Sequence, residues 1–269
     1  MVQYSRVGGG NVNVWLNMAL GNPYKSVSQQ TRVISEDWVN RNMFCPRCGN
    51  AELMKCKNNR PVSDFICNAC GNVFEVKATA GKFGHKINDG AYHTMMERIH
   101  SDTNPDFLFM EYQKQTAQVH QLFMVPKFYI TDRMIEKRKP LGPTARRAGW
   151  TGCFIVLDTL PLAGRIAIIQ DGCIQDKTNV CRQYEQTDFI KQIKIHARGW
   201  ILDVLRCIER IPDDSFSLQQ MYDFTPELSI LHPDNHNIQA KIRQQLQFLR
   251  DKGVLEFLGD GMYRKRIVF

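Results

Sequence analysis

Long apolar runs are missing from this 269-residue sequence: no stretch of eighteen apolar residues is present, the length that a membrane-spanning helix requires. Residues 1–26 also lack the charged-then-apolar pattern and the cleavage site of a secretory signal. We therefore expect a cytoplasmic protein with no membrane partner. The 43% hydrophobic content is enough to bury a core, as one large domain or two ordinary ones, without disulfide staples.

The nine cysteines are an odd number, and in a reducing compartment paired cysteines indicate metal binding rather than disulfides. Cys45 and Cys48 form one Cys-x-x-Cys-Gly segment, Cys67 and Cys70 form another, and 18 residues separate the pairs. This spacing predicts a four-thiolate zinc site within residues 45–70 that is structural, because no coordination position stays open. Four independently buried cysteines are the alternative, disfavoured because the paired spacing and the trailing glycine occur twice.

The net charge of +8 favours a polyanionic partner. Residues 1–195 contain 25 Lys and Arg against 17 Asp and Glu, whereas residues 196–269 contain ten of each class. If nucleic acid is the partner, the N-terminal part supplies most of the long-range attraction.

Hydrophobic periodicity divides the chain near residue 195. In residues 1–195, helical patterns at 26–43 and 87–100 alternate with strand patterns, which lie at 106–113, 119–130, 153–160 and 164–172. Residues 196–269 instead predict three helices and then a hairpin around Gly259-Asp260-Gly261, the order of a winged helix. We therefore predict an α/β (α+β) domain at 1–195 and a mainly α winged-helix domain at 196–269.

Asp64, Glu75 and Lys77 are candidate catalytic residues. Residues i and i+2 of a strand share a face, so Glu75 and Lys77 project together, and ten intervening residues allow the chain to turn back and bring Asp64 beside them. Two adjacent carboxylates suit Mg²⁺, with the Val76 carbonyl as a further ligand, and a nearby lysine can position water and stabilise phosphate charge. This loose pattern alone more often marks a solvated strand face.

The second Cys-x-x-Cys pair lies between Asp64 and Glu75, at the turn of the expected hairpin. A metal clip at that turn would fix the spacing of the two carboxylates, which is the preorganisation that a catalytic site requires.

Candidate DNA-binding residues fall in two regions. Arg146, Arg147 and Trp150 lie in a Gly/Pro-punctuated basic loop, where they could contact phosphate or guanine and offer a flat apolar surface, although Trp150 could equally be a core anchor. A candidate recognition helix spans 234–251, followed by a basic wing; polar side chains that could face DNA are His236, Asn237, Lys241, Arg243, Gln244 and Gln247 on the helix, and Arg264 and Lys265 on the wing. A solvated helix face is the alternative.

Residues 24–263 carry a family likeness. Segments in the same order as in the DpnI-type restriction endonucleases are ISEDWV, CPRCGN, NNRPVSDF, CNAC, INDGAYHTMMERI, PLGPTARRAGWTGC, QDG, RGW and KIRQQLQFLRDK. The sequence resembles that family across both predicted domains.

The resemblance implies a PD-(D/E)XK restriction-endonuclease-like core, followed by a winged helix that also reads methylated DNA. It further implies a Mg²⁺-dependent type II enzyme that cuts double-stranded DNA at GATC sites containing N6-methyladenine. Asp64, Glu75 and Lys77 match the catalytic positions, and Cys45, Cys48, Cys67 and Cys70 match the zinc ligands. We expect a monomer that requires no protein partner.

Two alternatives stay open. A zinc-containing winged-helix regulator without catalytic activity would share the charge, the zinc site and the recognition helix. A nuclease of the same fold could also cut a different site.

Overall fold

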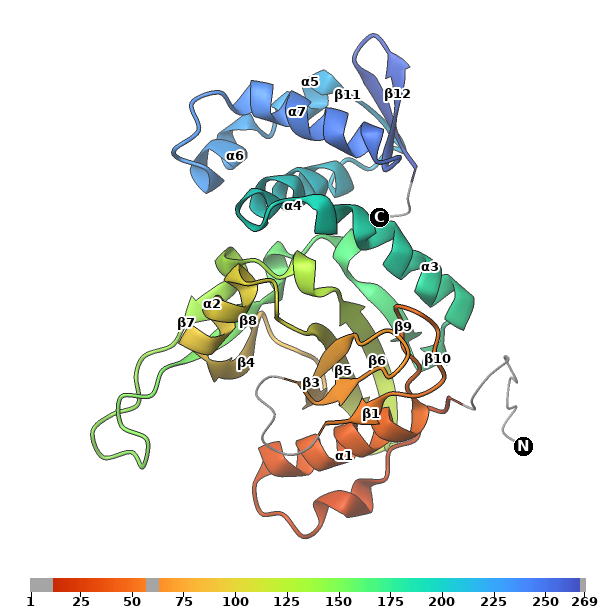
Figure 1. Cartoon of the computed structure of the whole chain (residues 1–269), viewed down its shortest axis with the longest axis vertical. Helices are drawn as coiled ribbons and strands as arrows, with labels where there is room; N and C mark the ends of the chain where they lie inside the picture. Colours follow the sequence, from red (N-terminus) through yellow and green to blue (C-terminus); the bar gives the residue numbers. More distant parts are fainter. Residues whose placement is uncertain (1–11, 57–62, 267–269) are drawn as a thin grey trace.

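A computed structural model describes residues 12–56 and 63–266 of the chain. The N-terminal part is built on a seven-stranded sheet with the order β1-β2-β3-β5-β6-β9-β10 (Figure 1). Its strands are β1 (Met54–Lys55), β2 (Phe65–Ile66), β3 (Val73–Ala80), β5 (Asp106–Gln113), β6 (Gln118–Val125), β9 (Ile166–Gln170) and β10 (Cys173–Ile174). β3 and β5 are parallel, and the other neighbouring pairs are antiparallel. The sheet thus forms the mixed α/β core that the sequence predicts.

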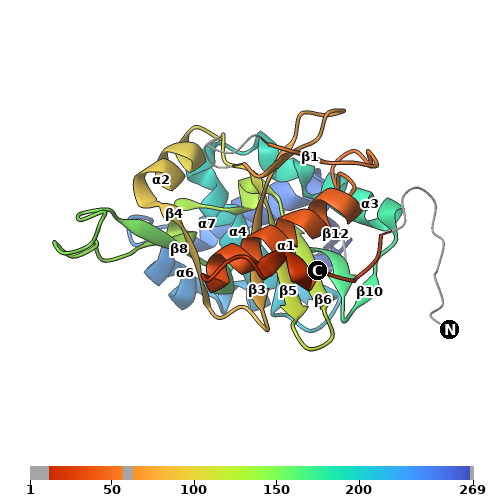
Figure 2. The same cartoon turned by 90° about the horizontal axis from the view of Figure 1, so that it is seen from below.

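The sheet is central because its middle strands are apolar on both faces. Residues 107–110 of β5 are fully buried, as expected for a strand covered on each side. Helix α1 (Val27–Asn42) packs against β3, and α3 (Lys177–Thr187) packs against β9. Figure 2 shows α1 running across the sheet. The prediction of a helix ending near Met43 is confirmed, with Ile34, Trp38 and Val39 buried.

A second, three-stranded sheet has the order β4-β8-β7, from β4 (Lys86–Ala91), β8 (Gly152–Val156) and β7 (Ile135–Lys137). The prediction of one helix over 87–100 is wrong in its first half, because residues 86–91 pair with β8 and α2 (Tyr92–His100) begins only at Tyr92. β7 and β8 continue into a segment, residues 138–151, that projects from the body in both Figure 1 and Figure 2. We call residues 138–151 the arm.

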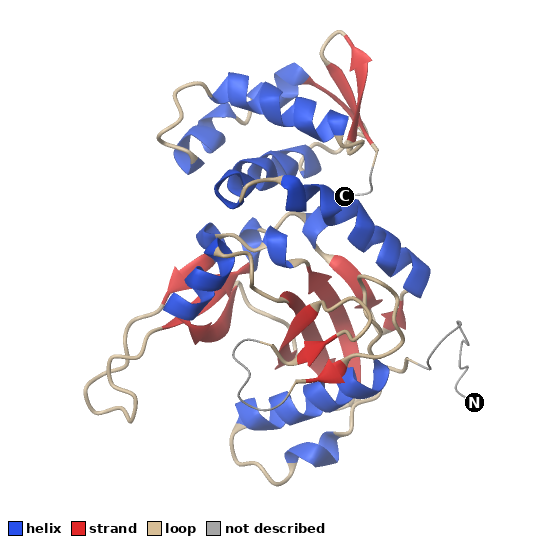
Figure 3. Cartoon of the chain, viewed as in Figure 1, coloured by secondary structure: helices blue, strands red, loops and turns tan. Residues whose placement is uncertain are grey.

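The C-terminal part is mostly helical (Figure 3). It comprises α4 (Ile195–Glu209), β11 (Ser215–Ser217), α5 (Leu218–Tyr222), α6 (Thr225–Leu231), α7 (Ile238–Asp251), β12 (Leu255–Gly259) and β13 (Met262–Lys265). A reciprocal capping box between Ser217 and Gln220 starts α5. Asp260 and Gly261 both have positive φ, the conformation that a two-residue turn between twisted strands requires. The hairpin is confirmed, and β11 joins it in a sheet ordered β11-β13-β12.

Short 3₁₀ segments connect these elements: η1 (Met18–Gly21), η2 (Lys127–Tyr129), η3 (Asp132–Met134), η4 (Leu157–Thr159), η5 (Leu162–Gly164) and η6 (Asp188–Gln192). Helix α4 packs against η2 and η5 of the N-terminal part and also against α7. One continuous cluster of buried apolar side chains therefore spans both parts of the chain. Within the described residues, no helix is both long and apolar enough to cross a membrane.

Candidate active site and zinc cluster

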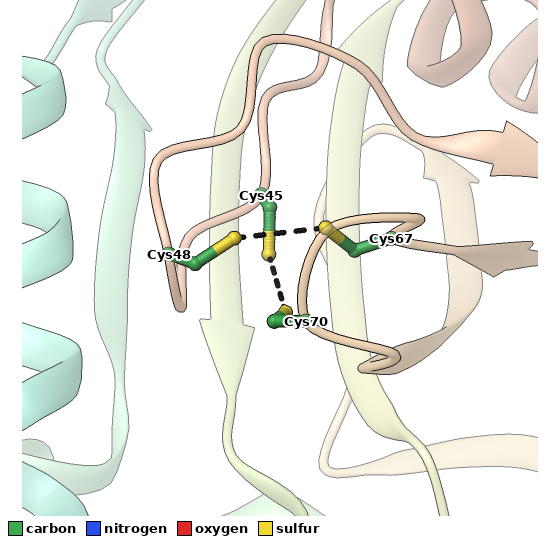
Figure 4. Close-up of side chains that lie close together, drawn as sticks. All are labelled: Cys45, Cys48, Cys67 and Cys70. Carbon is green, nitrogen blue, oxygen red and sulfur yellow. Dashed lines mark hydrogen bonds between the residues drawn. The ribbon is translucent and has the colours of Figure 1, made fainter.

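The four paired cysteines converge although 18 residues separate the pairs (Figure 4). Their sulfur atoms all lie within 4.8 Å of one another, with 3.6 Å between Cys45 and Cys70 and 3.6 Å between Cys48 and Cys67. Tetrahedral coordination with Zn–S bonds of about 2.3 Å would place sulfurs about 3.8 Å apart. The cluster can therefore hold zinc with little rearrangement.

The backbone of each Cys-x-x-Cys turn is shaped for thiolates. Gly49 and Gly71 have φ values of 72° and 70°, a left-handed conformation that favours glycine, and their amides donate to the Cys45 and Cys67 carbonyls over 2.8 Å. Burial raises the pKa of Cys45 and of Cys70; it also opposes ionisation of Cys67, but the amides of Cys70 and Ala69 and the neighbouring thiols lower the pKa of Cys67 to about 7. A thiol that ionises near neutral pH is a ready metal ligand.

The second cysteine turn closes the hairpin of β2 and β3. Phe65 pairs with Phe74, Ile66 pairs with Val73, and residues 67–72 make the connection. Asp64 directly precedes β2, and its amide donates to the Phe74 carbonyl over 2.9 Å. The predicted arrangement of a cysteine turn within this hairpin agrees with the observed strand pairing.

Asp64 and Glu75 come together along β3. Oδ2 of Asp64 accepts a hydrogen bond from the Val76 amide over 2.8 Å, so the Asp64 carboxylate is held against the strand between Glu75 and Lys77. Oε1 of Glu75 accepts from Nζ of Lys77 over 2.5 Å. The side chains of Asp64, Glu75 and Lys77 are 20%, 15% and 14% exposed. The structure thus gathers two carboxylates and one ammonium group in a partly dehydrated site.

Burial sets the electrostatics of this cluster. It raises the pKa of Asp64 above its usual value, against the Val76 amide, and raises the pKa of Glu75 to about 6, with the charge of Asp89 adding to the effect. Burial alone would lower the pKa of Lys77, but Glu75 and Asp89 raise it, so the ammonium group stays protonated.

One oxygen of the cluster is available to a ligand. Oε2 of Glu75 is buried and has no hydrogen-bond partner among the described residues. A buried carboxylate oxygen without a partner is costly, and a divalent cation would satisfy it. Two carboxylates with adjacent backbone carbonyls form the all-oxygen donor set that Mg²⁺ prefers. The residues present therefore fit that ion.

The cluster opens into a cleft of about 910 Å³. Arg32 and Glu36 of α1 line the opposite wall, and Nη2 of Arg32 lies 3.9 Å from Oδ1 of Asp64. Glu36 is only 5% exposed and pairs with Arg32 and Lys55. The cleft therefore borders the mostly buried carboxylates of Asp64 and Glu75 beside a cationic side chain that could meet phosphate.

Sequence reasoning missed Asp89 of β4, which contacts the Lys77 ammonium group directly. Its signal was hidden because residues 87–100 resemble one helix, whereas the first five residues of that region belong to a strand. Only the pairing with β8, distant in sequence, shows that Asp89 reaches the β3 cluster.

The predicted DNA-contact residues of the loop lie on the arm. Arg146 and Arg147 are exposed, and the Arg147 guanidinium lies 4.6 Å from the centre of the half-buried Trp150 ring. A Cβ at Gly152 would approach the Trp150 ring to 2.8 Å, so glycine at 152 lets the ring fold back over its own strand. Trp150 is therefore attached to the base of the arm and is not part of the central core.

Helix α7 begins later than predicted. The expected start at residue 234 is wrong, because Asn235 forms a turn back to His232 and Oδ1 of Asn235 accepts from the Asn237 amide, so the helix starts at Ile238. His236 therefore lies in the preceding loop, and Asn237 occupies the N-cap position.

The rest of α7 has the expected two faces. Ile238, Ile242, Leu246 and Leu249 are buried, whereas Arg243, Gln244 and Gln247 are exposed and Lys241 lies at the edge. Lys241 donates to Gln244 over 2.7 Å, and Arg243 donates to the Tyr222 hydroxyl over 2.6 Å. The polar face is thus open to a partner.

Local acceptors engage the basic residues of the wing. Nη1 of Arg264 lies 3.3 Å from Glu256, and the Lys265 ammonium donates to the Ile211 carbonyl over 2.6 Å. Arg264 is 51% exposed at its side chain and can exchange a surface partner for phosphate at little cost. Lys265 would have to give up a backbone acceptor.

Comparison with protein families agrees with this architecture. The model of the DpnI, or Dam-replacing, family matches residues 12–193, so the likeness begins twelve residues before residue 24, where the sequence alone placed its start. The Dam-replacing HTH domain matches residues 196–265. The chain accordingly belongs to the DpnI family of restriction nucleases and ends in a DNA-binding HTH domain.

Proposed function

We propose that the protein is a Mg²⁺-dependent type II restriction endonuclease that cleaves double-stranded DNA at GATC sites containing N6-methyladenine. Family membership supports DNA cleavage and methyl-directed restriction. The observation that carries the chemistry is the grouping of Asp64, Glu75 and Lys77 on a hairpin that the cysteine cluster closes. The alternative regulator without chemistry gives no reason for a buried, unpaired carboxylate oxygen in an open cleft.

Each member of the cluster has a proposed role. Asp64, Glu75 and the Val76 carbonyl would hold Mg²⁺, which supplies Lewis-acid stabilisation of phosphate charge and makes bound water a stronger nucleophile. Lys77 remains cationic, so its ammonium group can orient the attacking water and stabilise the negative charge that develops on the phosphate. Arg32, on the opposite wall, can contact the DNA backbone.

The division near residue 195 has a proposed purpose in methyl selection. Burial of one methyl group contributes only about 1 kcal/mol, so a single methyl-binding surface distinguishes methylated from unmethylated DNA only weakly. The proposal places one methyl-binding surface in the nuclease part, with Trp150 on the arm, and a second on α7. Together the two surfaces would multiply their preferences for methylated over unmethylated DNA. In this proposal Arg146 and Arg147 contact phosphate or guanine, and the exposed residues of α7 contact bases.

A plasmid prepared from hosts with and without GATC adenine methylation tests the function. We expect the purified protein to cut only the methylated plasmid, only with Mg²⁺, and without any added protein. The Glu75→Gln variant should not cut, whereas Glu185→Gln, a matched change on the exposed face of α3, should cut normally. Binding of methylated DNA without cleavage by the unmodified protein would instead favour the regulator.

A further inference from the structure

Asp89 is a buried carboxylate to which the proposed three-residue cluster gives no role. It belongs to β4 of the small sheet, whereas Glu75 and Lys77 belong to β3 of the large sheet. Its side chain is 6% exposed, and its Oδ1 accepts a hydrogen bond from the Lys77 ammonium group. The contact therefore joins the two sheets at the candidate active site.

The backbone of β4 is irregular at this position. Asp89 pairs with Cys153 and Ala91 pairs with Gly152, so Gly90 is an extra residue on its strand. The Cys153 thiol donates to the Gly90 carbonyl over 3.6 Å and lies 4.0 Å from Oδ2 of Asp89. Bulges of this kind re-aim a side chain and are common beside active sites. Here the bulge lies next to the residue that reaches Lys77.

Lys77 needs such an anchor because its four-carbon side chain is flexible and the three N–H donors of its ammonium group rotate freely. Glu75 and Asp89 are its two carboxylate partners among the described residues. Under the proposed function, Glu75 also binds the divalent ion, so part of its charge is committed elsewhere. Asp89 is the partner whose charge stays available to Lys77.

We propose that Asp89 is a positioning residue that holds the Lys77 ammonium group at the reaction site. This inference rests on the proposed function for its effect on catalysis, but the holding of Lys77 can be tested without it. Asp89 is not assigned to the ion, because its oxygen is directed at Lys77.

The first test measures Lys77 itself. Amine-reactive labelling followed by peptide mass spectrometry reports how freely its ammonium group meets reagent. We expect Asp89→Asn to increase the labelling rate of Lys77 several-fold. Glu136→Gln is the matched control, since it breaks an exposed Lys86–Glu136 pair on the same sheet and should change only Lys86. Unchanged labelling of Lys77 in Asp89→Asn would overturn the proposal, whether or not the protein cuts DNA.

The second test measures catalysis on methylated GATC DNA. A displaced catalytic group commonly costs about ten- to a hundredfold in rate. We expect Asp89→Asn to lower the single-turnover rate by that factor, with unchanged DNA affinity in Ca²⁺ and no further loss when added to Lys77→Ala. A wild-type rate in Asp89→Asn, or a further loss in the double variant, would refute the catalytic part.

Calorimetric titration with Mn²⁺ separates positioning from metal binding. Asp89→Asn should bind the ion as the unmodified protein does, whereas Glu75→Gln should bind it more weakly. An equal loss in both variants would make Asp89 a ligand and overturn the inference. If the unmodified protein fails to cut while Asp89→Asn still frees Lys77 for labelling, the proposed function fails and the holding role remains.

Discussion

Replacing Glu75 with glutamine should make the metal-free protein more stable while it abolishes cleavage. The Glu75 carboxylate is 15% exposed, and one of its oxygens is buried without a partner. Burial raises its pKa from 4.5 to about 6, even with the attraction of Lys77 opposing the shift. One pKa unit corresponds to about 1.4 kcal/mol, so ionised Glu75 costs the folded state roughly 2 kcal/mol at pH 7.5.

The direction of this pH-dependent stability change follows from proton binding. The folded state binds this proton more tightly than the unfolded state, so the stability associated with Glu75 is present below about pH 4.5 and is lost as pH rises through about 6. Glutamine has no such proton to lose. We therefore expect Glu75→Gln to gain about 1–2 kcal/mol at pH 7.5, and less than half of that at pH 5.

Urea denaturation in Mg²⁺-free buffer measures this difference. Chelators should be omitted, because a cysteine cluster that holds zinc would lose the metal to them. Added Mg²⁺ should stabilise the unmodified protein more than the variant, since Glu75→Gln is expected to bind the ion more weakly. Glu185→Gln should change stability by less than about 0.5 kcal/mol. A destabilised Glu75→Gln variant at pH 7.5, or equal stabilisation of both proteins by Mg²⁺, would refute the reasoning.

Three further outcomes are expected. Cys48→Ser should abolish binding of about one zinc ion per chain, measured by inductively coupled plasma mass spectrometry. It should also lower the free energy of unfolding by more than about 4 kcal/mol, the range associated with loss of a metal site. Normal stability without zinc would contradict this. Trp150→Ala should weaken binding to methylated DNA by about 1 kcal/mol in fluorescence anisotropy, as loss of an apolar contact to the methyl group predicts, and unchanged affinity would exclude Trp150 from the interface. Asp102→Asn should cost about 1–3 kcal/mol at pH 7, because it leaves the 6%-exposed Arg198 without its carboxylate. Burial opposes ionisation of Asp102, but Arg198 lowers its pKa, so its stabilising effect is present above about pH 4 and is lost as pH falls through the lowered value; a wild-type advantage that persists in acid would argue against this pairing.

Local signals in the sequence were enough to predict the cysteine cluster and the β2–β3 hairpin. Both depend on fixed short spacings: Cys-x-x-Cys-Gly turns, and a return of the chain within ten residues. The buried stripe of α7 was equally accessible, because it repeats with the helical period.

Features set by distant contacts were not predictable. Residues 86–91 include Asn, Asp and Gly, which have low strand propensity, and they form β4 only because β8 pairs with them. The bulge at Gly90 and the direction of Asp89 follow from that pairing. The late start of α7 depends on a turn at Asn235 that competes with the helix. Tertiary pairing at β4 and a side-chain-stabilised turn before α7 thus determined the two boundaries that hydrophobic periodicity predicted wrongly.

The continuous apolar cluster across α4 bears on how relatives of this protein can exchange parts. Ile201, Val204, Leu205 and Ile208 of α4 are fully buried within a cluster that also contains Phe107 of the sheet and Leu246 of α7. A DNA-reading part from another relative would have to present the same surface to η2 and η5, or it would leave apolar side chains in water. If the exposed face of α7 and the arm contact bases as proposed, changes in sequence preference are therefore easier to acquire there than by replacing residues 196–269 as a block. For the same reason, heating should unfold the nuclease part and the HTH domain together in one transition. The two parts thus form one thermodynamic unit, and they evolve as one.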